Sequence, residues 1–303
     1  MMSNRVIAVL LCAAGFIWMS MSPAVNAAGN SALKVYAVNY PLQYMAERIG
    51  GDHVEVFFPA PADVDPAFWR PDEDTILRYQ QADIILINGA GYSQWLTYVV
   101  LPYAGLVDTT ANISDSLIMS RDARSHAHGD GPVRTDGDAA YITWLDPELA
   151  VEQARAVKDA FIMRKPEHEP FFSERFELLE EELDALDNEW ISLLDSYRGA
   201  LVPVADDIYE YWAARYGLNL HGTAWSPDRM PPDEEWRKLD EIIKEHPVDF
   251  MIWNSVPDSD VKDRLRKRGI ESVVIQSADL KPEEGGFMDV MRANVERFRL
   301  VAD

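Results

Sequence analysis

The stretch that decides the fold is residues 171–194, FFSERFELLEEELDALDNEWISLL. Its apolar side chains recur every three or four positions, which is the spacing of one buried helix face. They are Phe172, Phe176, Leu179, Leu183, Leu186, Trp190 and Leu193 or Leu194. The pattern predicts a single helix of roughly 25 residues, or about 38 Å at about 1.5 Å per residue. That length suits a rigid connection between two lobes, and we assign residues 166–199 to it.

The residues before this helix, 28–165, alternate short strand patterns with helical patterns, as parallel α/β layers do. Strands are predicted at 33–38, 54–58 and 84–87, and helices at 40–49, 72–81 and 147–163. Residues 121–138 are poor in apolar side chains and rich in Gly, Asp and His, so a surface loop is expected there.

The residues after the helix, 200–303, repeat the alternation. Strands are predicted at 200–204, 250–253 and 273–275, and helices at 206–216, 236–245, 261–267 and 288–300. We therefore expect an α/β fold in which two βα-repeat lobes are joined by one long rigid helix, with a ligand cleft between the lobes.

Charge and motifs exclude two classes of function. The 303 residues hold 28 Lys and Arg against 51 Asp and Glu, a formal charge of −23 that disfavours nucleic acid as a partner. Such a surface either attracts cations or is simply tuned for solubility. We find no His-Glu-x-x-His, Gly-x-Ser-x-Gly, phosphate-loop or dinucleotide motif, so an enzyme is not expected.

The first 27 residues read as an export signal. Arg5 precedes an apolar run of about 14 residues, shorter than the ~20 that span a membrane, and small residues at 25–27 offer a cleavage site. Cys12 is the only cysteine, and Leu11 before it is larger than a lipid-attachment site prefers. We expect a periplasmic protein with a cleaved signal, no lipid anchor, and no thiol for disulfides or metal sites.

Several short segments carry a family resemblance when they are read in order. They are VNYPL at 38–42, ADVDP at 62–66, ADI at 82–84, WLDP at 144–147, RYGL at 215–218 and MRAN at 291–294. Together they resemble the zinc- and manganese-specific substrate-binding proteins of bacterial ABC importers, over nearly the whole mature chain. The resemblance implies two α/β lobes on one long helix, a metal held between them, and delivery of that metal to a membrane permease.

The same resemblance implies three His and one acidic metal ligand, and most of them are replaced here. Ala67 stands at the first His position, Ile142 at the second and Asp206 at the third. The acidic position falls at Ser277, or at Asp279 if the correspondence shifts by two residues. Alanine and isoleucine cannot coordinate a metal, so at least two nitrogen ligands are missing.

Two interpretations of the remaining polar positions stay open. Asp206 and Asp279, with or without Asp207, would make an oxygen-rich site for a harder cation. Alternatively, Asp206 only caps the helix that follows it. The tryptophans expected near the cleft either stack on an organic solute or pack in the core. The candidate cleft-lining residues are Asp65, Trp69, Trp144, Asp207, Trp225 and Asn254.

His126 and His128 lie in the expected surface loop, in the sequence SHAHGD. They either capture Zn²⁺ loosely or are incidental. We interpret the other four histidines as structural.

The sequence thus predicts the solute-binding component of an ABC importer with altered metal ligands, for zinc first and manganese second. The alternatives are a metal-free interaction protein or a binder of another solute.

The expected partner is a membrane permease, a periplasmic metal chaperone is a second candidate partner, and the expected state is a monomer. No metal should be needed for folding.

Overall fold

Two parallel four-stranded sheets organise the computed structural model, which describes residues 31–119 and 139–302. The first sheet has the order β2-β1-β3-β4. Its strands are β1 (Leu33–Ala37), β2 (Val54–Phe57), β3 (Ile84–Ile87) and β4 (Leu106–Asp108). Val35 and Ile84 lie side by side in the register of β1 and β3. Both are buried, as a central parallel strand requires.

Three helices accompany the first sheet, and together they form the first lobe. They are α1 (Tyr40–Gly50), α2 (Glu73–Gln80) and α3 (Pro147–Arg164). The Asn39 side chain caps α1 by accepting a hydrogen bond from the Leu42 amide at 3.0 Å. Asp72 caps α2 in the same way through the Thr75 amide at 2.8 Å. These caps fix the residue at which each helix begins.

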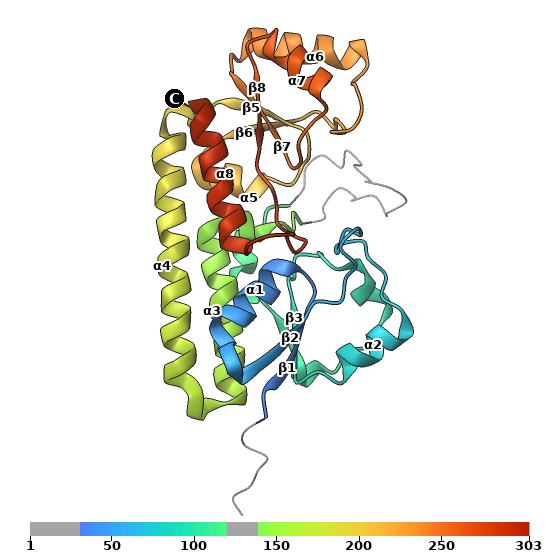
Figure 1. The fold of residues 1–303 in the computed structure, drawn as a ribbon, viewed down its shortest axis with the longest axis vertical. Coiled ribbons are helices and arrows are strands. Elements are labelled where there is room, and N and C mark those ends of the chain that lie inside the picture. The colour runs from blue at the N-terminus through green and yellow to red at the C-terminus, as the bar shows by residue number, and fades with distance from the viewer. Residues whose placement is uncertain (1–30, 120–138, 303) are drawn as a thin grey trace, which may run out of the picture. The chain divides into compact units, whose positions relative to one another are not determined.

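The long helix predicted from the opening stretch is confirmed as α4 (Glu169–Leu194), of 26 residues. Its buried apolar residues are the predicted ones, and of the two alternatives at its end Leu194 is buried. The helix packs against α1 and α3 of the first lobe and against α5 and α8 of the second. It therefore joins the two lobes along one side (Figure 1).

The second lobe repeats the arrangement, with the sheet order β6-β5-β7-β8. Its strands are β5 (Leu201–Val204), β6 (Asn219–Gly222), β7 (Phe250–Trp253) and β8 (Glu271–Val274). Its helices are α5 (Glu210–Tyr216), α6 (Asp233–Glu245), α7 (Ser259–Arg266) and α8 (Phe287–Ala302). Trp236 of α6 and Trp253 of β7 share a smaller apolar cluster on one side of this sheet.

Short 3-10 helices link these elements. They are η2 (Gly51–His53), η3 (Gln94–Tyr98), η4 (Tyr103–Gly105), η5 (Ala111–Ser116), η6 (Thr143–Leu145), η7 (Pro166–His168) and η8 (Asp195–Tyr197). Within the described residues, none of the helices has both the length and the apolar character to cross a membrane.

The sequence predictions were wrong in three places. Strands β4 and β6 were missed, because three residues in one and Asn, His and Gly in the other give no clear strand pattern. The helix expected from 206 begins instead at Glu210 with Tyr209 at its N-cap position, so Asp206 does not cap it.

The predicted loop 121–138 lies outside the described residues, so it stays a prediction.

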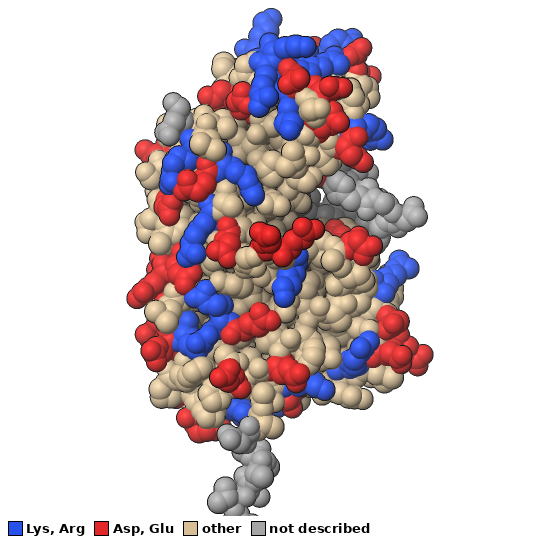
Figure 2. Space-filling model, in the orientation of Figure 1, with Lys and Arg blue, Asp and Glu red and all other residues tan. Residues whose placement is uncertain are grey.

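Charged side chains of both signs are interspersed over the face shown in Figure 2. Basic side chains are most frequent at the end of the second lobe where α6 and α7 lie. Many of these are paired, for example Arg264 with Asp233 at 2.6 Å and Arg268 with Asp240 at 2.6 Å. The negative charge of the chain is thus not gathered into one patch on this face.

Candidate interlobe site

The residues at the family's ligand positions in the second lobe follow the carboxyl ends of its parallel strands. Asp206 comes after β5, while Ser277 and Asp279 come after β8. Asn254, also a candidate, comes directly after β7. Carboxyl ends of parallel strands meet at one edge of a sheet, which is where α/β proteins bind ligands. The topology therefore places these positions at a suitable edge.

These positions are closed to solvent. Ala67 is 1% exposed, Ile142 is 5% exposed, and both belong to the main hydrophobic cluster. Ser277 is 3% exposed and Asp206 is 9% exposed. The resemblance implies imidazole ligands at the positions of Ala67 and Ile142, and the methyl and butyl groups of these residues cannot coordinate a metal.

The polar residues after β7 and β8 bond to one another. The Ser277 hydroxyl donates to Asp279 Oδ1 at 2.6 Å, and the Ser277 amide donates to Asn254 Oδ1 at 2.8 Å. Burial raises the pKa of Asp279 above its usual value, and the Ser277 hydrogen bond opposes that rise. The Asp279 carbonyl accepts from the Tyr40 amide of the first lobe at 3.1 Å. The structure thus brings together three of the predicted residues.

Trp144 crosses between the lobes at the same place. Its indole Nε1 donates to the carbonyl oxygen of Ser277 at 2.6 Å, and the side chain is 1% exposed. Its ring meets the ring of Tyr92 at 5.5 Å between centroids, nearly edge to face. A direct hydrogen bond therefore joins the two lobes beside Ile142 and Ser277.

Tyr92 is a residue that the sequence reasoning missed. Its hydroxyl is buried and has no hydrogen-bond partner among the residues that the structure describes. Burial raises its pKa well above the usual value, and the nearby carboxylates of Asp279 and Asp65 add to the rise. Its position just after β3, in the segment NGAGY at 88–92, was the available signal. A buried hydroxyl without a described partner, near two carboxylates, is a polar feature that needs an explanation.

A buried amide and hydroxyl network fixes the loop that carries Ile142 and Trp144. Gln153 Nε2 donates to Asn88 Oδ1 and to Thr109 Oγ1, both at 3.0 Å. Thr143 Oγ1 donates to Gln153 Oε1 at 2.9 Å, and Asn88 Nδ2 donates to the Tyr141 carbonyl at 3.0 Å. The network ties η6 and α3 to the end of β3, so the loop has one defined position.

The other candidates lie in different surroundings. Asp65 accepts from the Ala67 amide at 2.9 Å and so shapes the loop between β2 and α2. Trp69 packs against Trp95 at 6.5 Å between ring centroids. Asp207 lies against Gly222, where an added Cβ would stand 2.1 Å from Asp207 Oδ1.

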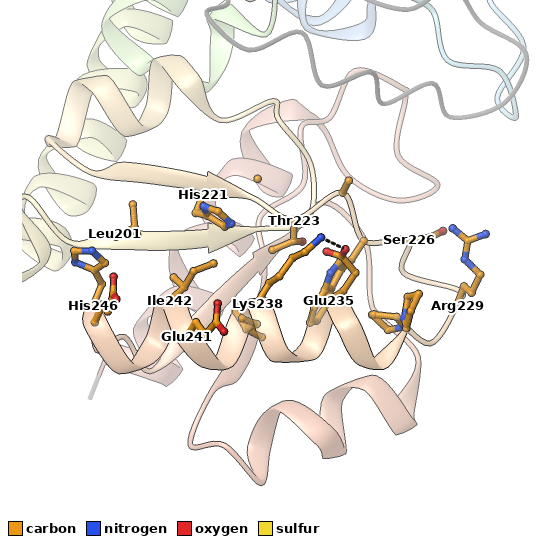
Figure 3. A pocket seen from close by; sticks show the side chains of 17 residues that line it. Leu201, His221, Thr223, Ser226, Arg229, Glu235, Lys238, Glu241, Ile242 and His246 are labelled. Atoms are coloured by element: carbon orange, nitrogen blue, oxygen red, sulfur yellow. Dashed lines mark hydrogen bonds and ion pairs between the residues drawn. The ribbon is translucent and has the colours of Figure 1, made fainter.

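Trp225 belongs to the second lobe alone, since it packs against Trp236 and Trp253 in the smaller cluster. It also lines a hollow of about 900 Å³ between the β5–β6 edge and α6. Figure 3 shows Leu201 and His221 facing Ile242 and Lys238 of α6 across this hollow, with Lys238 paired to Glu235 at 2.7 Å. None of the family's ligand positions lines it.

Across residues 31–119 and 139–302, no three His, Cys, Asp or Glu side chains gather in a way that could hold a metal ion. Asp206 and Asp279 therefore lack a third ligand of these types in that part of the chain. His126 and His128 fall outside the described residues, so metal capture by them stays a prediction. Of the other histidines, His53 and His168 stack at 3.9 Å between ring centroids, far along α4 from this site.

The relatives found by sequence comparison include proteins named for metal binding or metal transport. A putative metal-binding protein of Chlamydia muridarum is 24% identical over 212 residues, covering 70% of this chain and 72% of the relative. The manganese ABC transporter substrate-binding lipoprotein PsaA of Streptococcus anginosus is 22% identical over 304 residues, covering 96% and 94%.

Solved structures share the fold. The metal-dependent lipoprotein YcdH of Bacillus subtilis has a TM-score of 0.76 at 21% identity, covering 89% of this chain and 98% of that one. The Zn(II)-bound ZnuA-like domain of AdcA from Streptococcus pneumoniae has a TM-score of 0.73 at 17% identity, covering 90% and 100%. The family model for zinc-uptake complex component A, periplasmic, matches residues 35–300. The chain therefore belongs to this family, whose members are the substrate-binding proteins of zinc and manganese ABC transporters.

Proposed function

We propose that the chain is the extracytoplasmic binding component of a metal-type ABC importer, and that its interlobe site does not hold Zn²⁺ or Mn²⁺ in the family's manner. The observation that carries this proposal is the set of side chains at the ligand positions. Ala67 and Ile142 are packed in the core, and Trp144 bonds across the lobes to the Ser277 carbonyl at 2.6 Å. The protein would dock on a membrane permease and catalyse no reaction.

An altered-ligand zinc or manganese site has weaker support. Structural zinc sites use four ligands and catalytic sites use three, whereas only Asp206 and Asp279 remain here. A harder cation would need about six oxygen ligands.

Binding of a different small solute at the same place is a second candidate. It is favoured by the buried Tyr92 hydroxyl, which no described residue satisfies, beside the carboxylates of Asp65 and Asp279. A polar organic solute that accepts from Tyr92 and donates to a carboxylate would complete this arrangement.

The deciding experiment is native mass spectrometry after chelation and metal replenishment. We compare the purified protein with His126→Ala/His128→Ala and with Asp206→Ala. Any Zn²⁺ or Mn²⁺ retained by the wild type should disappear in the loop variant and persist in Asp206→Ala. An ion that survives the loop changes and is lost with Asp206 would overturn the proposal.

A variant that restores the missing histidines tests whether their absence is what prevents metal binding between the lobes. Ala67→His, Ile142→His and Asp206→His together restore the nitrogen ligands that the resemblance implies. The variant should acquire one Zn²⁺ that the wild type does not hold between its lobes. The same three changes with glutamine in place of histidine are the matched control for size and polarity.

The export predictions belong to the same proposal. We propose a signal cleaved after Ala27 and a monomer built from two lobes on α4. Several relatives are named lipoproteins, so the alternative is a lipid on Cys12. The mass of the mature protein distinguishes them, because lipid attachment would leave Cys12 as the first residue.

A further inference from the structure

Side chains of helix α5 in the second lobe contact both ends of the segment that carries Ile142 and Trp144. Tyr211 and Arg215 are four positions apart, so they lie on one face of this helix. Tyr211 is 2% exposed, and its hydroxyl donates to the Ala140 carbonyl at 2.7 Å. The same hydroxyl accepts from the Ile118 amide at 3.2 Å.

Arg215 holds the other end of the same loop. Its Nε and Nη2 donate to the two carboxylate oxygens of Asp187 on α4, at 3.0 and 2.6 Å. Its Nη1 donates to Glu148, in the first turn of α3. Its Nε also lies 3.9 Å from Oδ1 of Asp146, the residue that caps α3. One guanidinium thus ties α5 to both α4 and the start of α3.

We infer that Tyr211 and Arg215 are positioning residues that set where segment 140–148 of the first lobe lies against the second lobe. Tyr211 fixes the segment at Ala140 and Arg215 fixes it at Glu148. Between these points lie Ile142 and Trp144, so the two contacts determine the spacing across the interlobe site. The inference holds whichever solute the protein carries.

The geometry favours this role over simple stabilisation of α5. A bidentate Arg–carboxylate pair is directional, and here Arg215 is only partly exposed while Asp187 is nearly buried. Tyr216 adds a third contact, donating to Asp187 Oδ1 at 3.0 Å. The helix is therefore held on α4 while its other contacts reach the first lobe, which is the arrangement needed to transmit a shift between lobes.

The test uses amide hydrogen exchange and a distance between spin labels. Labels go on cysteines at Asp74 of α2 and Lys244 of α6, both exposed, in a Cys12→Ser background. The informative variant is Tyr211→Phe/Glu148→Gln, which removes one hydroxyl and one surface charge without leaving Asp187 unpaired. Arg215→Lys is a partial replacement that keeps the charge. Arg299→Met is the matched control, since Arg299 of α8 pairs with Glu189 of α4 at 2.8 Å.

Amides of 140–148 should exchange at least about tenfold faster in the double variant, as expected for loss of one buried and one charged hydrogen bond. The label distance distribution should broaden, Arg215→Lys should give a smaller effect, and Arg299→Met should leave both readouts unchanged. Unchanged exchange of 140–148 in the double variant would overturn the inference. Equal acceleration of all core amides would also overturn it, because that result indicates general destabilisation.

Discussion

Asp146 makes the stability of this protein depend on pH in a direction that can be measured. Its carboxylate caps α3 by accepting from the Glu148 amide at 2.9 Å, and the residue is 8% exposed. Burial raises its pKa from 3.8 to about 6, although the charge of Arg215 and the capping hydrogen bonds oppose the rise. The folded state therefore holds the Asp146 proton more tightly than the unfolded chain does.

The magnitude follows from linkage. A group with a raised folded-state pKa contributes stability that is fully present below its unfolded pKa and is lost as the pH rises through its folded pKa. One pKa unit corresponds to about 1.4 kcal/mol, so the rise from 3.8 to about 6 corresponds to about 3 kcal/mol. This stability should be present below about pH 4 and lost by about pH 7.

Asp146→Asn removes the titration and keeps an amide oxygen that can cap α3. We expect the variant to gain about 3 kcal/mol relative to wild type between pH 4 and pH 7, on the same linkage. Urea unfolding at each pH gives the difference, and subtracting wild type cancels the other titrating groups. Asp184→Asn, at an exposed position of α4, is the control.

A difference between Asp146→Asn and wild type that stays constant from pH 4 to pH 7 would refute the reasoning. It would mean that Asp146 titrates at the same pH in the folded and unfolded states. A difference of opposite slope would mean that Arg215 and the cap outweigh burial.

Three further changes give sharp outcomes. Burial is the main cause of a lowered pKa of His53, and the charge of the neighbouring His168 adds to it. The free energy of unfolding should therefore fall as the pH drops below about 6.5. The variant His53→Gln should remove that dependence in urea titrations. Tyr92→Phe should leave unfolding free energy unchanged or raise it by about 1 kcal/mol, because the lost hydroxyl has no described partner; a clear loss would reveal a bound solute or water. Trp144→Phe should cost about 1–3 kcal/mol by leaving the Ser277 carbonyl unpaired, measured by thermal unfolding.

The sequence predicted the helices and the apolar strands well, and it missed two strands that lack an apolar pattern. Helix α4 was predicted because seven apolar positions repeat at helical spacing from Phe172 to Leu194, which no strand or loop imitates. Strand β4 has only three residues and β6 contains Asn, His and Gly, so position in the sheet rather than local preference determines them. Asp206 was read as a helix cap because an acid before an apolar run is typical of one, yet the chain turns for three more residues before α5 begins.

The candidate site likewise contains positions that the sequence indicated and contacts that it did not. Resemblance gave the positions of Ala67, Ile142 and Ser277, since each is counted from a nearby motif. The Tyr92 hydroxyl and the Gln153 network were not foreseen, because contacts between residues far apart in sequence decide which buried polar groups are paired. Asp146 was read only as part of a motif, and its raised pKa follows from burial that the motif does not reveal.

The contacts between the lobes bear on how such a protein would respond to a cargo. A ligand can shift an opening equilibrium only by the difference between its affinities for the open and closed states. Here the contacts between the lobes are made by the protein itself, through Trp144 to Ser277, Tyr40 to Asp279 and Tyr211 to Ala140. Each such hydrogen bond stabilises this arrangement of the lobes by about 0.5–1.5 kcal/mol.

A permease that recognises this arrangement of the lobes would then bind the protein even when it carries no cargo. It follows that removing metal should leave the label distance between α2 and α6 unchanged, whereas Trp144→Phe should lengthen it. A protein of this fold that closed only around its metal would give the opposite pair of results.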